Sequence, residues 1–105
     1  MKSFKLGLVL VLILVAPLSN CCNETSLPDS LNNLYSSDAS LRNEAALQLA
    51  RCGALADEAV PKLSELLYDN NVGVQSSAAY ALQKIDTKSA RLAYQDAIDR
   101  REIKR

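Results

Sequence analysis

The sequence predicts an all-α domain, a short α-solenoid of about two and a half helix pairs, which makes about five helices. Residues 41–52 match residues 74–85 without a gap at an offset of 33, a period typical of stacked helical repeats. Residues 59–67 match residues 90–98 at an offset of 31. Because one such unit cannot bury its apolar face alone, we expect neighbouring units to share a continuous core.

The first helix is expected to begin near Leu27. Leu27, Leu31 and Leu34 recur at helical spacing and define one apolar face. Pro28 stands in the first turn, where a helix tolerates proline. Asparagines and serines weaken the remainder of this segment, so we interpret it as a terminal capping unit.

The second helix is expected from about Ala39 to Cys52. Asp38 is a suitable N-cap, and Gly53 stands where helices commonly end. The buried face is predicted to consist of Leu41, Ala45, Leu49 and Cys52.

The next three helices follow the same logic. The third is expected from about Asp57 to Tyr68, because acidic residues favour a helix N-terminus and a proline falls in the first turn. The fourth is expected over residues 72–85, capped by Asn70 or Asn71, and the fifth over residues 87–102. Their predicted core residues are Val60, Leu63, Leu66 and Leu67 in the third helix and Val74, Ala78, Leu82 and Ile85 in the fourth.

The third and fourth helices form a pair whose pattern is known. The residues that carry it are Ala59, Val60, Pro61, Leu63, Leu66, Leu67 and Asp69 in one helix and Val74, Gln75, Ala78, Ala79, Ala81, Leu82 and Ile85 in the other. This pattern resembles the HEAT repeat, particularly its short bacterial form, and the likeness covers about residues 27–103. In that family, aspartates and arginines of adjacent units often pair along the stack.

The resemblance implies a contact between Asp69 and Arg42 across the unit boundary, although simple solvation of both side chains is the alternative. As a surface pair it would contribute only about 0–1 kcal/mol.

The resemblance also implies that the second helix of each pair lines a concave, protein-binding face. The predicted partner-binding residues are Asn43, Leu47 and Arg51 on one helix and Ser76, Tyr80 and Lys84 at equivalent positions on the other. Leu47 and Tyr80 are larger than a solvated face requires, and Tyr beside a cation is common in recognition surfaces. The alternative is that both side chains only fill the packing between repeats.

Residues 1–20 are expected to be a signal peptide. Lys2 and Lys5 precede an unbroken apolar run over residues 6–16, the pattern of a secretory signal. The run is shorter than the roughly 20 residues that a membrane-spanning helix needs.

The end of this signal resembles the lipobox of bacterial lipoproteins. Residues 18–21 read Leu-Ser-Asn-Cys, with Asn20 standing where that family prefers Gly, Ala or Ser. The resemblance implies that Cys21 carries the lipid and that residues 21–26 form a lipidated tether. Cys22 is not the aspartate of an inner-membrane retention signal, which favours the outer membrane facing the periplasm. The alternative is a secreted or periplasmic soluble protein.

Cys22 and Cys52 are the two remaining cysteines. Cys52 occupies the repeat position of Ile85, so we expect a small core residue there. A disulfide between Cys22 and Cys52, which an envelope compartment permits, is the alternative.

Catalysis is not expected. The chain has no histidine, which removes the commonest general base and metal ligand, and no cofactor or metal is predicted. Without Lys2 and Lys5 the chain has 10 basic and 12 acidic residues, a net charge of −2, so nucleic acid is not an expected partner.

These observations predict a lipid-anchored envelope scaffold that binds an unidentified envelope protein. The alternative function is an accessory factor of an enzyme or pigment system that binds a small apolar ligand. A second copy of the chain is a further candidate partner, through the side of the last helix that carries Tyr94 and Ile98.

Overall fold

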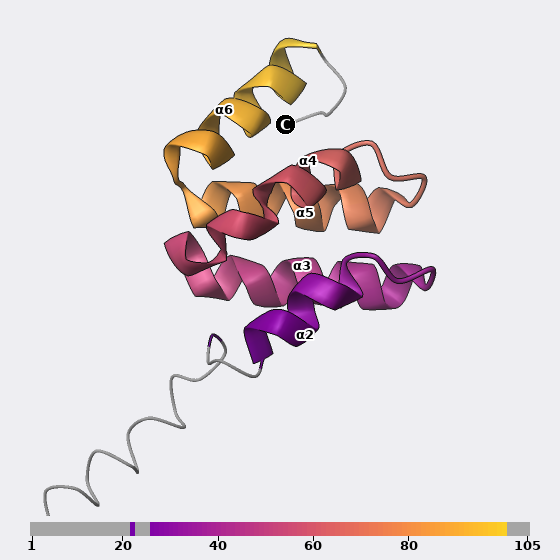
Figure 1. Ribbon diagram of the computed structural model, residues 1–105. Coiled ribbons are helices and arrows are strands. Elements are labelled where there is room, and N and C mark those ends of the chain that lie inside the picture. The colour runs from indigo at the N-terminus through magenta and orange to yellow at the C-terminus, as the bar shows by residue number, and fades with distance from the viewer. Residues whose placement is uncertain (1–21, 23–25, 101–105) are drawn as a thin grey trace, which may run out of the picture.

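The computed structural model describes residue 22 and residues 26–100, and this part of the chain is all-α, as predicted (Figure 1). Its elements are α2 (Ser26–Asn33), α3 (Ala39–Cys52), the 3₁₀ segment η2 (Gly53–Ala59), α4 (Val60–Leu66), α5 (Val72–Ile85) and α6 (Lys88–Asp99).

Helices α3 and α5 lie side by side and form the most extensive contact of the fold (Figure 1). Helix α2 packs on α3, and α4 packs on α5. In Figure 1, α2 and α4 both lie in front of the layer that α3 and α5 form, and α6 continues the arrangement against α4 and α5. The described part of the chain therefore has two layers of helices with the core between them.

The helix ends have local chemical causes. The N-cap side chains of Asp38, Asn71 and Thr87 accept hydrogen bonds from backbone N–H groups in the first turns of α3, α5 and α6, which are otherwise unsatisfied. The cap at Asp38 was predicted, Asn71 resolves the choice between two asparagines, and the cap at Thr87 was not foreseen. Gly53 ends α3 with φ of 58°, a conformation that glycine adopts without steric cost.

The predicted core is confirmed at most positions. All eight predicted residues of the third and fourth helices are buried, and Leu34 is fully buried directly after α2. The prediction that Leu41 belongs to the core is wrong, since 38% of its surface is exposed. Its repeat equivalent Val74 is buried because α5 packs against α3, whereas no described element covers the corresponding side of α3.

The predicted third helix differs from the structure at its start. Residues 53–59 form a 3₁₀ segment with a kink at Ala56, and the α-helix begins only at Val60, with Pro61 in its first turn. Proline lacks an N–H and is therefore best placed at the first turn of the α-helix. The last helix ends at Asp99, and residue 102, where its end was predicted, lies outside the described residues.

Candidate functional site

The exposed surface of α3 and α5 carries the predicted partner-binding residues. The two helices are held in register near both ends. Ser77 Oγ of α5 donates a hydrogen bond to Asn43 Oδ1 of α3, and the end of α3 at Gly53 lies beside the carbonyl of Lys84. Residues at equivalent repeat positions between these contacts are therefore neighbours on adjacent helices.

Leu47 and Tyr80 are such a pair, with 38% and 47% of their surfaces exposed. Lys84 Nζ lies 5.5 Å from the centroid of the Tyr80 ring, within the range of a cation–π contact. Arg51 and Ser76 are also exposed. This surface thus combines an aliphatic side chain, an aromatic ring and cations.

Asn43 has a different position from the other five residues. It is half-buried, and its side-chain oxygen accepts the hydrogen bond from Ser77. Part of its hydrogen-bonding capacity therefore joins α3 to α5, so Asn43 contributes less to an outward-facing surface than the sequence led us to expect.

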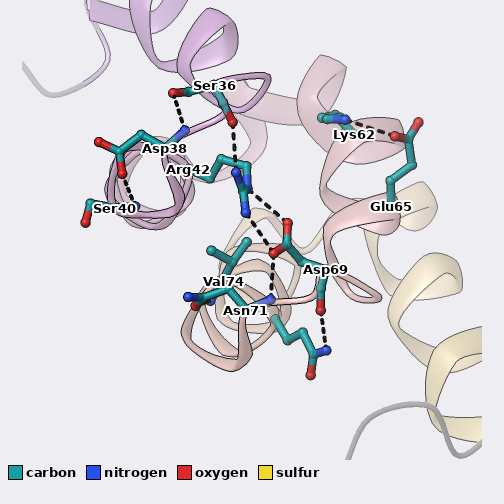
Figure 2. Close-up of polar contacts among 10 residues, drawn as sticks. Ser36, Asp38, Ser40, Arg42, Lys62, Glu65, Asp69, Asn71 and Val74 are labelled. Carbon is teal, nitrogen blue, oxygen red and sulfur yellow. Dashed lines mark hydrogen bonds and ion pairs between the residues drawn. The ribbon is translucent and has the colours of Figure 1, made fainter.

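Arg42 and Asp69 form a bidentate ion pair, which decides between the pairing and the solvation that the sequence left open (Figure 2). Arg42 Nε donates to Asp69 Oδ2 at 2.9 Å, and Nη2 donates to Oδ1 at 3.0 Å. The third donor, Nη1, bonds to the carbonyl of Ser36 at 2.9 Å. The two side chains are only 13% and 8% exposed, so the pair is more deeply buried than the surface contact that we assumed.

The hydrogen bonds from Arg42 hold the pKa of the Asp69 carboxyl below its usual value of 3.8, and the backbone N–H of Asn71 acts in the same direction. Burial opposes this effect by raising the pKa. The net lowering means that Asp69 stays ionised, and paired with Arg42, at neutral pH.

The contacts around this pair recur along the chain. Arg42 donates to the carbonyl of Ser36, and Gln75 donates to the carbonyl of Asp69. Donor and acceptor are both shifted by 33 residues. Ser36 lies in the turn after α2, and Asp69 lies in the turn after α4. In each of these turns, the backbone N–H two positions later also donates to the side chain of Ser36 or Asp69. The two turns therefore use the same pattern of side-chain hydrogen bonds.

A further contact here was not foreseen. Lys62 Nζ lies 4.6 Å from the centroid of the Tyr35 ring and so connects the turn after α2 to α4. The recurrence of Leu34-Tyr35 as Leu67-Tyr68 at the same offset of 33 marks Tyr35 as a repeat position, but it does not point to Lys62.

Cys22 and Cys52 form a disulfide with their Cα atoms 5.2 Å apart. Cys52 is buried, as predicted, but it is bonded rather than a plain core residue, which corrects our preferred interpretation. The reason is topological. Helices α2 and α3 run in opposite directions (Figure 1), so the start of α2 and the end of α3, which carries Cys52, lie on the same side.

Neither a metal site nor a membrane-spanning helix is found in the residues that the structure describes. Within residue 22 and residues 26–100, no group of His, Cys, Asp or Glu side chains could hold a metal ion. No helix in the same residues is long and apolar enough to cross a membrane. The predicted lipidation site Cys21 and the signal peptide lie outside the described residues.

The chain matches no protein-family model, no curated protein and no solved structure.

Proposed function

We propose that this chain is a lipid-anchored protein of the bacterial envelope that binds a protein partner through the exposed surface of α3 and α5. The observation that carries the proposal is the pair of large side chains, Leu47 and Tyr80, exposed at equivalent positions of two adjacent helices. Aromatic side chains with an apolar body and a polar tip are enriched in protein interfaces.

The proposal includes a HEAT-like stack of helix pairs. Its support is the recurrence of hydrogen bonds at an offset of 33 around Ser36 and Asp69, together with the side-by-side packing of α3 and α5. Stacked repeats present an extended surface while each unit touches only its neighbours. Such a surface suits binding and requires no catalytic group.

The lipid anchor is supported by the sequence of residues 18–21 and places the partner among envelope proteins. The alternative of a small apolar ligand has less support. A cavity of about 340 Å³ between α5 and α6 is lined by Leu82 and Tyr94 together with four charged or amide side chains, Gln83, Asp86, Arg91 and Gln95. Apolar ligands instead favour pockets lined predominantly by apolar side chains.

Two experiments test the proposal in sequence. Palmitate labelling in a bacterial host should label the wild type and leave the Cys21→Ala variant unlabelled. Absence of label in both would remove the lipid anchor from the proposal.

Crosslinking in the membrane fraction should then capture a partner with the wild type and lose it with the Leu47→Ser/Tyr80→Ser double variant. Leu92→Ser, which changes an exposed leucine on α6, is the matched control and should retain the partner. Equal capture by all three proteins would exclude the α3–α5 surface as the binding site.

A further inference from the structure

The disulfide determines which end of the domain lies nearest to the proposed lipid anchor. Cys21 directly precedes Cys22, and consecutive Cα atoms are about 3.8 Å apart. The Cα atoms of Cys22 and Cys52 are 5.2 Å apart. The Cα atom of Cys21 is therefore within about 9 Å of that of Cys52, whatever the conformation of the chain between Cys22 and α2.

Several helix ends meet at this edge of the domain. The end of α3 at Gly53 lies beside the end of α5 at Lys84. The 3₁₀ segment η2 is bound to the start of α6, because Asp57 Oδ1 accepts hydrogen bonds from the hydroxyls of Thr87 and Ser89. Figure 1 shows these ends on the same side of the domain as the start of α2. We call this the anchor edge.

The exposed side chains of the anchor edge suit a phospholipid surface. Leu55 projects from η2 with 69% of its surface exposed. The helix ends at this edge also carry exposed cations: Arg51 on α3, Lys84 on α5, which packs on the Tyr80 ring, and Lys88 on α6. Apolar side chains flanked by long cationic ones are typical of protein segments that lie in the headgroup region of a bilayer.

Acidic side chains on the same edge are largely engaged within the protein. Asp57 accepts hydrogen bonds from two hydroxyls, and Asp86 forms an ion pair with Arg91 at 3.1 Å. Glu58 is the remaining exposed carboxylate of η2. Contact with a membrane would therefore depend on Leu55 and the covalent anchor, with the cations as an additional attraction to anionic lipid.

We propose that the anchor edge docks on the bilayer to which Cys21 is attached and that Leu55 inserts among the lipid headgroups. This inference rests on the lipid anchor of the proposed function. In the docked state the C-terminal end of α3 lies at the membrane and the rest of the helix points away from it. The 14 residues of α3 span about 21 Å. The Leu47 and Tyr80 surface then stands to the side of the bilayer, accessible to a partner on the same membrane.

The absence of tryptophan from the chain permits a direct test. Leu55→Trp places one fluorophore on the anchor edge, and Val72→Trp places one at the opposite end of α5. Val72 is the matched control because 72% of its surface is exposed. Each full-length variant is purified from bacterial membranes, its acylation and disulfide are verified by mass spectrometry, and it is added to phosphatidylethanolamine and phosphatidylglycerol vesicles with brominated acyl chains.

We expect vesicle flotation of both variants, with emission of Leu55→Trp shifted to shorter wavelength and quenched several-fold more than that of Val72→Trp. Acylated protein that floats with the vesicles while both variants are quenched equally would overturn the docking proposal and leave the lipid anchor intact. Protein without acyl chains, which does not float, would instead overturn the anchor, and with it the docking that depends on the anchor.

Discussion

The ion pair between Arg42 and Asp69 offers the sharpest test of how α3 is held to the turn after α4. The change is Asp69→Asn, which preserves the shape of the side chain and removes its charge. In the wild type, Asp69 accepts two hydrogen bonds from Arg42 and one from the backbone N–H of Asn71. The variant leaves the guanidinium of Arg42 largely buried, without the carboxylate and bonded to the carbonyl of Ser36.

The structure sets the magnitude of the effect. Breaking a fully buried pair costs about 3–5 kcal/mol, whereas an exposed pair contributes about 0–1 kcal/mol. Because the two side chains are 13% and 8% exposed, Asp69→Asn should lower the free energy of unfolding by about 2–3 kcal/mol. For a domain of this size, this loss corresponds to a fall in Tm of at least about 8 °C.

Urea denaturation followed by circular dichroism measures the free energy of unfolding. Glu65→Gln is the matched control, since it neutralises a carboxylate that pairs with Lys62 while 69% of its side chain is exposed, and it should cost less than about 0.5 kcal/mol. If the two variants lose the same free energy within about 0.5 kcal/mol, the Arg42–Asp69 pair does not stabilise the contact between α3 and the turn after α4, and the reasoning fails.

The same pair predicts a pH dependence. The pKa of Asp69 is lower in the folded protein than its usual value of 3.8, so the unfolded state binds a proton first as the pH falls. The stabilisation is complete well above that value and is lost as the pH falls through the lower, folded pKa. The difference in stability between the wild type and Asp69→Asn should therefore be constant near neutral pH and shrink below about pH 4. A difference that persists unchanged in acid would contradict this.

Three further predictions concern stability. Reduction of the Cys22–Cys52 disulfide, which closes a loop of 30 residues, should lower the free energy of unfolding by about 3–4 kcal/mol. An unchanged urea midpoint after reduction would count against it. Leu34→Ala removes a fully buried side chain and should cost about 2–5 kcal/mol. The exposed control Leu92→Ala should stay within about 0.5 kcal/mol, and equal thermal midpoints would refute the difference in burial. Gly53→Ala should cost about 1–3 kcal/mol, because φ of 58° with ψ of −139° strains any residue with a Cβ; a stability equal to the wild type in the same assay would disprove the strain.

Much of the fold could be predicted from local sequence patterns. The N-cap at Asp38, the helix end at Gly53 and the buried stripe of α5 follow from side-chain chemistry and from the spacing of apolar residues. The third predicted helix was less accurate because Pro61 fits the first turn of a helix, which moves the α-helical start to Val60.

The candidate site could be predicted from the sequence only in part. The pairing of Arg42 with Asp69 was one of two alternatives, but its burial was not foreseen, and burial raises the expected cost of removing one partner above that for a surface pair. Asn43 was placed on the binding surface by its repeat position, although its contact with Ser77 depends on how closely α3 and α5 approach.

The sequence by itself determined the all-α class, the helix ends and the residues that recur at an offset of 33, because these depend on chemistry within a few turns of chain. Only the tertiary structure decided which apolar residues lie on a helix side that no described element covers, as the contrast between Leu41 and Val74 shows. It also decided the bond between Cys22 and Cys52. A disulfide requires two Cα atoms within a few ångströms of each other, and that distance is a property of how the helices pack.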